Sequence, residues 1–201
     1  PRIQTIDDKK PVGICGSGIL DAVAELLKAG IINSHGKFDK ENRCICIDSL
    51  GNARYVLLPD YYDDNDETCP SEDLISINQK DIVEIQLAKG AMRTGIEILL
   101  EYAGIDFRDI DKIIIAGAFG SYIDPKNVIN IGMFPNIPLK KISQVGNAAS
   151  TGAKMVLISE KQRKTAEDIG KKIRYLELNV FPSFSEHFAQ SVQFPKSEEI
   201  I

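Results

Sequence analysis

The 201-residue sequence is 43% hydrophobic and 26% charged, which is enough apolar material for a substantial core in one large domain. Its 24 Lys and Arg residues against 29 Asp and Glu residues give a net charge of −5 without a dense basic cluster, which argues against a nucleic-acid partner. The apolar runs are far shorter than the roughly 20 residues that span a bilayer, so we expect a cytoplasmic protein with no membrane association.

The four cysteines, Cys15, Cys44, Cys46 and Cys69, fit neither a disulfide scaffold nor a common zinc or four-thiolate iron-sulfur spacing. We therefore predict reduced thiols. The sequence begins at Pro1, and residues 1–11 are typical of a linker or of the end of an upstream strand. This start favours a fragment of a longer protein.

A glycine-rich turn at residues 13–18 precedes the first predicted helix, at about 17–29, which Gly30 would end. The next segment, residues 31–77, is predicted to be an insertion. Within it, residues 42–48 and 53–58 form a hairpin, and the acidic stretch 60–73 forms a solvated loop.

The longest predicted helix begins after Asn78, the N-cap residue, and reaches about Tyr102 before Gly104. Gly90 and Gly95 lie inside it. Because an internal glycine costs about 1 kcal/mol relative to alanine, we expect a neighbouring element or a ligand to approach the backbone there.

A β-branched strand at 113–115 leads into a second glycine turn at 117–120, and a short helix begins at Asp124-Pro125. A further short strand at 142–145 precedes a third glycine turn at 146–152 and a helix at 148–159.

Towards the C-terminus we predict a helix near 164–171, an alternating strand at 173–179 and a helix through about Val192 that begins with a Ser183–Glu186 capping box. Residues 12–194 would form the main lobe, and residues 195–201 a disordered tail.

The three glycine turns each follow a predicted strand or precede a predicted helix, where free N–H groups favour anions and glycine permits close approach of a ligand. Any one of these turns could serve strand-to-helix geometry alone, but the three together favour a nucleotide site. No turn is a P-loop, and Gly13, Gly16 and Gly18 lack the spacing of the dinucleotide fingerprint.

Residues 113–120, an apolar strand followed by small residues, resemble the adenosine motif of the actin-like ATPase superfamily, which includes sugar kinases and heat-shock chaperones. Residues 16–21 are similar to the superfamily's Gly-Gly-x-x-x-Asp phosphate segment, with Ser17 in place of the second glycine. The resemblance implies an α/β fold, a ribonuclease H-like lobe with a mixed sheet, flanking helices and an inserted hairpin.

A narrower resemblance links residues 13–21, 86–91, 116–125 and 146–149 to the C-terminal domain of reductive activators of corrinoid proteins. That family couples ATP to the reduction of Co(II) corrinoid to Co(I), with electrons from a [2Fe-2S] domain that would lie upstream of this chain. The implied partner is a corrinoid protein or a corrinoid-dependent methyltransferase, and a homodimer is possible.

The resemblance implies a site for ATP or ADP, with Asp21 near magnesium-bound water. It gives no catalytic residue, and the family's other phosphate motifs are absent from this sequence, so we do not expect ATP hydrolysis by this chain alone. The candidate nucleotide-binding residues are Gly16, Ser17, Gly18, Gln79, Glu84, Lys89, Gly117, Ala118, Phe119 and Gly120.

Two alternatives remain at this stage. A small-molecule kinase of the same fold would place its catalytic base in a second lobe. A module that has kept the fold and lost the nucleotide would bind only a partner protein.

Overall fold

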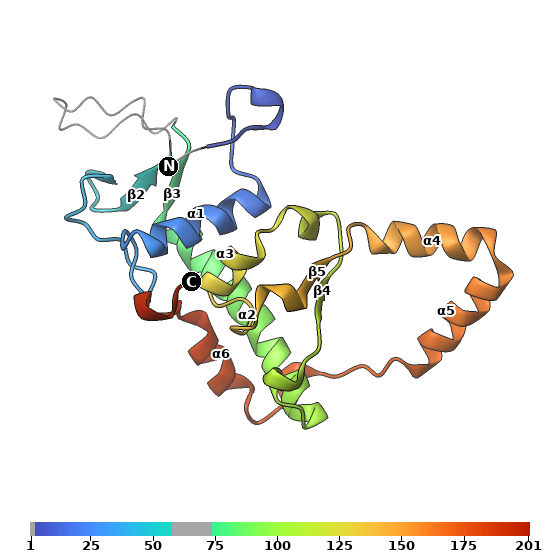
Figure 1. Cartoon of the computed structure of the whole chain (residues 1–201). Coiled ribbons are helices and arrows are strands. Elements are labelled where there is room, and N and C mark those ends of the chain that lie inside the picture. The colour runs from blue at the N-terminus through green and yellow to red at the C-terminus, as the bar shows by residue number, and fades with distance from the viewer. Residues whose placement is uncertain (1–2, 58–73) are drawn as a thin grey trace.

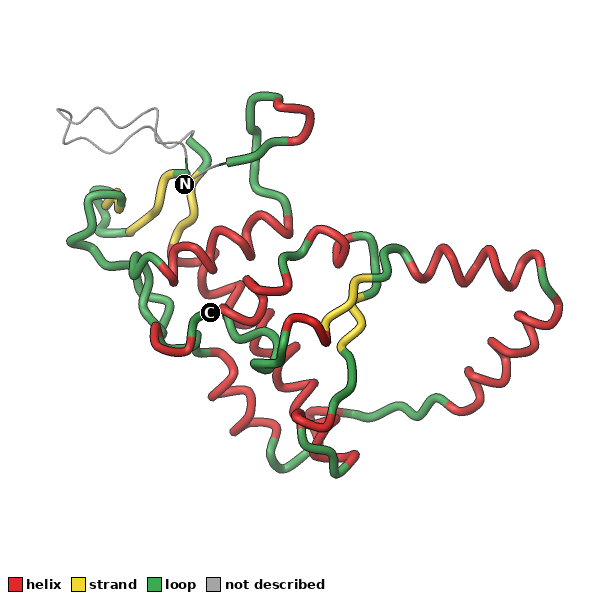
Figure 2. The backbone as a smooth tube through the Cα atoms, viewed as in Figure 1, coloured by secondary structure: helices red, strands yellow, loops and turns green. Residues whose placement is uncertain are grey.

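A computed structural model describes residues 3–57 and 74–201. The predicted acidic loop at 60–73, with Cys69, lies outside the described residues. In the described part, a long central helix, α2 (Gln79–Ala103), passes behind α1 (Gly16–Lys28) and α3 (Pro125–Asn130), while two short sheets lie on opposite sides of these helices (Figures 1 and 2).

Helix α1 supplies one apolar face of the core. Leu20, Val23 and Leu27 recur at spacings of three and four residues and are at most 5% exposed. Burial of each such side chain contributes about 1.5–3 kcal/mol. The helix ends just before Gly30, which has a left-handed conformation with φ +70°, as the sequence predicted.

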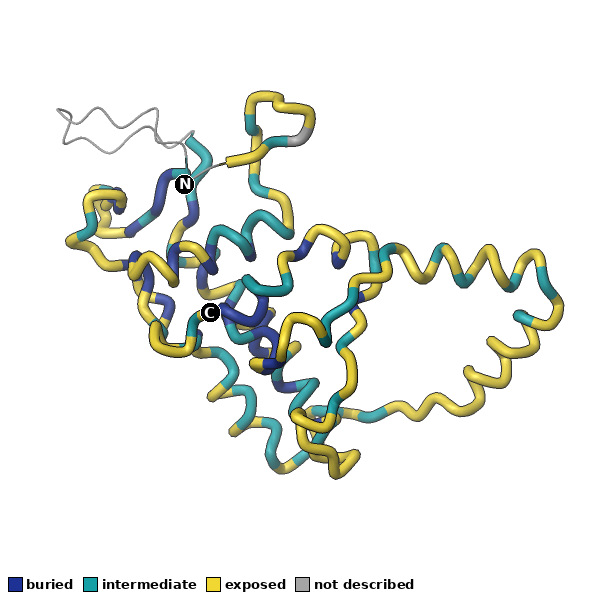
Figure 3. The backbone as a smooth tube through the Cα atoms, viewed as in Figure 1, coloured by how far each residue is buried: buried dark blue, intermediate teal, exposed yellow. Residues whose placement is uncertain are grey.

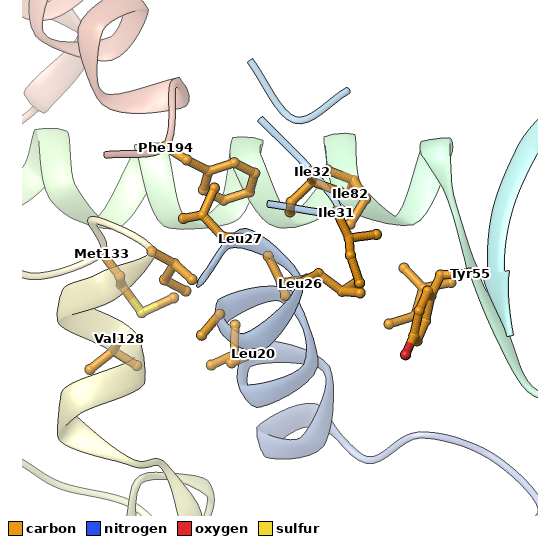
Figure 4. Close-up of a cluster of buried hydrophobic side chains, with 14 of the residues drawn as sticks. Leu20, Leu26, Leu27, Ile31, Ile32, Tyr55, Ile82, Val128, Met133 and Phe194 are labelled. Atoms are coloured by element: carbon orange, nitrogen blue, oxygen red, sulfur yellow. The ribbon is translucent and has the colours of Figure 1, made fainter. Parts of the chain in front are cut away.

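The core continues from α1 into α2, α3 and the C-terminal segment. Figure 4 shows side chains from these elements meeting in one cluster, whose labelled members are Leu20, Leu26, Leu27, Ile31, Ile32, Tyr55, Ile82, Val128, Met133 and Phe194.

The inserted hairpin is confirmed, and it belongs to a three-stranded antiparallel sheet. β1 (Ile45–Ile47) pairs with β2 (Ala53–Val56), which pairs with β3 (Ser76–Asn78). Gly51, with φ +82°, supplies the turn between β1 and β2. Because β3 leads directly into α2, this sheet anchors the start of the longest helix.

The second sheet contains two parallel strands, β4 (Ile113–Ile115) and β5 (Ile142–Gln144). The described strands therefore form two separate sheets and not the one mixed sheet expected, because the hairpin pairs with β3. Ile115 is buried at 9% exposure, whereas Ile114 is 60% exposed. One face of β4 is thus exposed in the described chain, although a run of three β-branched residues is typical of a strand buried on both faces.

The long helix was predicted well. Asn78 and Asp81 form a reciprocal capping box at its start, and Gly104 ends it in a left-handed conformation. Gly90 lies against Val192 of α6 (Phe184–Val192), and Gly95 faces Leu178. Neighbouring elements of the chain, as expected, approach the helix at both glycines.

We predict that Gly90→Leu separates α6 from α2. A Cβ atom at Gly90 would lie 3.1 Å from Val192 Cγ2 and 3.3 Å from two backbone atoms of Val192, so a large side chain has no room. We expect a loss of about 1–3 kcal/mol in the free energy of unfolding, measured by urea titration. The control is Gly152→Ala, because open space surrounds Gly152 in α4 (Ala148–Ile158). Equal stability of Gly90→Leu and the wild type would contradict the close packing.

Helices α4 and α5 (Glu160–Lys172) form an arm that projects from the rest of the chain (Figure 1), and most of the arm is exposed (Figure 3). Leu157 and Ile158 are 75% and 84% exposed. In the part of the chain that the structure describes, no helix combines the length and apolar character needed to cross a membrane.

Three C-terminal predictions were wrong. Residues 173–179 pair with no described strand and instead belong to the connection that leads from α5 towards α6 (Figure 1). The Ser183 hydroxyl donates to Glu101 Oε2 at 2.7 Å and does not cap α6. This bond, followed by one from His187, lowers the pKa of Glu101.

The expected disordered tail instead packs on the core. Phe194, the residue just before this tail, is 4% exposed, and its N–H donates to the Ser34 carbonyl at 2.8 Å. At the end of the chain, the Ile201 N–H donates to Asn130 Oδ1 at 2.9 Å, and Asn130 Nδ2 donates to the Ile201 carbonyl at 3.2 Å. Local composition did not predict these contacts, because their partners lie more than 70 residues away in the sequence.

Candidate functional site

The structure brings the three glycine turns together at the carboxyl ends of β4 and β5. The Phe119 ring covers Gly16, where a Cβ atom would lie 2.5 Å from the ring edge. The Gly117 N–H donates to the Gly146 carbonyl at 2.7 Å. The first turn therefore contacts the second, and the second is hydrogen-bonded to the third. We call this region, residues 15–18, 117–121 and 146–148, the glycine-turn cluster.

The first turn ends at the start of α1, where Cys15 is the N-cap residue. The Gly18 N–H donates to Cys15 Sγ at 3.3 Å, and Ser17 Oγ lies 3.4 Å from the same sulfur. These contacts, that of Ser17 first, lower the pKa of the exposed Cys15 thiol. Helix geometry leaves the N–H groups of Gly16 and Ser17 without an intrahelical carbonyl acceptor. A backbone hydrogen bond from Ser17 also helps to lower the pKa of the Cys15 thiol, so the Gly16 N–H is the group that can donate to an anion.

The second turn has a backbone that requires glycine. Gly117 has φ +116°, a conformation that residues with side chains rarely adopt. A Cβ atom on buried Gly120 would lie 2.5 Å from Ile115 Cγ2. The Phe119 ring is 52% exposed beside these small residues. The turn thus presents backbone and one aromatic ring to a ligand.

Gln144 connects β5 to the second turn. Its amide Nε2 donates to the Gly120 carbonyl at 2.6 Å and to the Ile123 carbonyl at 2.7 Å. Both bonds restrain the turn relative to the sheet. Sequence analysis missed Gln144 because a lone glutamine at a strand end carries no distinctive signal.

Asp21 lies one turn into α1 and is held by α3. Asn127 Nδ2 donates to Asp21 Oδ1 at 2.8 Å, which fixes the orientation of the half-buried carboxylate. This bond engages one of the two carboxylate oxygens. Asn127 was also missed by sequence analysis, because its partner lies 106 residues away in the chain.

The three candidate nucleotide-binding residues on α2 have contacts outside the glycine-turn cluster. Gln79 Nε2 donates to the Gly36 carbonyl at 2.7 Å, and Glu84 is exposed. Lys89, for which solvent exposure is the ordinary expectation, is 1% exposed and donates to the Gln193 carbonyl. None of these contacts joins the three side chains to the glycine-turn cluster.

Comparisons with known proteins agree with the expected family. Residues 1–200 match the family described as the C-terminal domain of RACo, the ASKHA domain. The chain is 37% identical over 200 residues to "Corrinoid activation enzyme RamQ" of Eubacterium limosum, covering 95% of this chain and 32% of RamQ. It is 30% identical over 162 residues to "[Co(II) methylated amine-specific corrinoid protein] reductase" of Methanosarcina barkeri, covering 81% of this chain and 25% of that protein.

A comparison with a solved structure points to the same family. The "Reductive activator for corrinoid,iron-sulfur protein" superimposes with a TM-score of 0.82 and 36% identity, over 96% of this chain and 30% of that one. These findings confirm the actin-like ATPase fold class. The chain spans about a third or less of the length of the relatives it matches.

Proposed function

Because the chain belongs to the family of RACo C-terminal domains, an ASKHA family, we propose that its glycine-turn cluster is part of an ATP- or ADP-binding surface. The meeting of the three turns, with Phe119 on Gly16 and Gly117 bonded to Gly146, is the observation that carries the proposal. A companion lobe outside this chain would supply the other phosphate contacts.

The residues of the cluster suit the parts of a nucleotide. The start of α1 at Gly16 and Ser17 suits a phosphate, since a helix start attracts anions. The small residues Gly117 and Ala118, with the Phe119 ring, suit the nucleoside. We assign these residues, with Gly18 and Gly120, to the nucleotide and leave Gln79, Glu84 and Lys89 out of the site.

Asp21 is the proposed link to magnesium. Mg²⁺ prefers oxygen ligands and keeps several of its waters, so a carboxylate can bind it through water. The bond from Asn127 leaves Asp21 Oδ2 available for this role. When bound, magnesium would neutralise phosphate charge, while the chain itself positions the nucleotide.

For the longer protein that carries this domain, we propose ATP-dependent reductive activation of a corrinoid protein or corrinoid-dependent methyltransferase. The names of the matched relatives support this role. One electron from an iron-sulfur cluster outside this chain would reduce Co(II) to Co(I). Nucleotide occupancy would change closure of the lobes and so the affinity for the corrinoid partner. A small-molecule kinase is less favoured, because the relatives named are corrinoid activators.

The test is calorimetric titration of the full-length protein with ATP and magnesium. We expect saturable binding that weakens at least tenfold in Gly16→Val, because the new side chain would displace the Phe119 ring. The matched control is Gly13→Val, since nothing lies within 4 Å of a Cβ atom at Gly13 in the same turn. Absence of saturable binding by the wild type, or equal loss in both variants, would overturn the assignment.

A further inference from the structure

A cavity of about 500 Å³ lies between α2, α6 and the C-terminal segment, apart from the glycine-turn cluster. Helices α2 and α6 run side by side in Figure 1. The volume lies within the range of small-molecule sites in proteins. Its charged and titratable lining residues are Lys89, Arg93, Glu97, His187, Lys196 and Glu199.

Lys89 is the most buried of these residues, at 1% exposure. Its ammonium donates to the Gln193 carbonyl and lies 5.2 Å from the centre of the Phe194 ring. An ammonium has three donors, and the carbonyl accounts for one of them. Burial, and then the charge of Arg93, lower the pKa of Lys89 to about 7.

Glu97, one of the two carboxylates of the lining, is already engaged by other groups. Arg93 Nε lies 2.5 Å from Glu97 Oε1, and His187 Nδ1 lies 3.4 Å from Glu97 Oε2. The second His187 nitrogen lies 3.3 Å from Glu101. Both oxygens of Glu97 therefore have cationic or titratable partners, and neither is left for Lys89.

Lys196 and Glu199 add one charge of each sign to the lining, both on exposed residues of the C-terminal segment. The positive charge of Lys196 and the negative charge of Glu199 cancel in the net charge of the lining. Protonated Lys89 is then a positive charge in the cavity with no described carboxylate partner. A buried charge of this kind is costly unless an opposite charge pairs with it.

We propose that this cavity binds an oxyanion, the phosphate or carboxylate group of a small ligand, with Lys89 as the main cationic contact. Lys196 would attract the same group from the outer part of the lining. This inference is independent of the proposed nucleotide surface, because no residue of the glycine-turn cluster lines the cavity.

Binding of the anion should be accompanied by proton uptake. An anion next to Lys89 favours the ammonium form and raises the pKa of the lysine. At pH 8 the free protein has Lys89 mostly neutral, so the complex takes up a proton. Loss of the uptake when Lys89 is replaced would assign it to this lysine.

The experiment is calorimetric titration of the full-length protein with inorganic phosphate and, separately, with succinate at constant ionic strength. Two buffers of different ionisation enthalpy at pH 8 report proton uptake. We expect Lys89→Met to weaken binding at least tenfold and to abolish the proton uptake. Lys154→Met, which removes a charge from an exposed residue of α4, serves as the matched control.

Two further variants keep the test decisive. Lys196→Glu changes an exposed residue and should fold normally, and we expect it to weaken binding severalfold. Gly16→Val should leave succinate binding unchanged even where it removes ATP binding. The proposal fails if neither anion binds the wild type, or if Lys89→Met and Lys196→Glu bind the anions as tightly as Lys154→Met does.

Discussion

Replacing Gly117 with valine is expected to destabilise the chain by about 2–3 kcal/mol and to abolish measurable ATP binding by the full-length protein. The cause is backbone conformation, because no atom of the described residues lies within 4 Å of a Cβ at this position while φ is +116°. A β-branched residue cannot adopt this φ without strain. Relief of the strain would break the 2.7 Å bond from Gly117 to Gly146 and separate the second and third turns.

Urea unfolding and ATP calorimetry measure the two effects. Gly152→Ala is the matched control, because it also adds a Cβ atom in open space but lies in helix α4. It should stabilise the chain by up to about 1 kcal/mol, since alanine is the better helix former. If both variants change stability in the same direction, backbone strain at Gly117 is not what shapes the turn.

The elements predicted best have signals within a few residues of sequence. The Asn78 cap and Gly104 terminator of α2 are local, and so are the turn residues of the β1–β2 hairpin. The meeting of the second and third glycine turns was also foreseeable, because they follow the parallel strands β4 and β5, whose carboxyl ends lie at one edge of the sheet.

The errors arise where distant partners decide the structure. The segment 173–179 had the alternating pattern of a strand, but it pairs with none of the strands that the structure describes. Ser183 had the spacing of a capping box, yet Glu101 competes for its hydroxyl. A strand requires a partner strand, and an N-cap requires a side chain that is not hydrogen-bonded to another group. Neither condition can be read from the local sequence.

Lys89 illustrates the same limit within the candidate site. A lysine on a long amphipathic helix is ordinarily solvated, but here the C-terminal segment folds back over it. The burial depends on contacts across 104 residues of sequence. The family resemblance selected Lys89 as a nucleotide-binding candidate, and the structure places it in a cavity that no residue of the glycine-turn cluster lines.

Lys89→Met is expected to stabilise the chain at pH 6 by about 1–3 kcal/mol and to have a smaller effect at pH 9. Burial lowers the pKa of Lys89 from an ordinary 10.5 to about 7, so the unfolded state binds more protons between these values. The wild-type chain therefore gains stability as the pH rises from about 7 towards 10.5. Below pH 7 both states hold the proton, and the full cost of burying the charge remains.

The pKa difference alone corresponds to about 5 kcal/mol, and loss of the contacts with Gln193 and Phe194 in the variant reduces the expected gain. Urea unfolding of the wild type and of Lys89→Met at pH 6 and pH 9 measures this gain in stability. Lys154→Met should differ from the wild type by the same amount at both pH values. If wild type and Lys89→Met respond alike to pH, the lysine is not desolvated as described. If they differ, the chain retains a destabilising buried cation, which is typical of residues kept for a ligand.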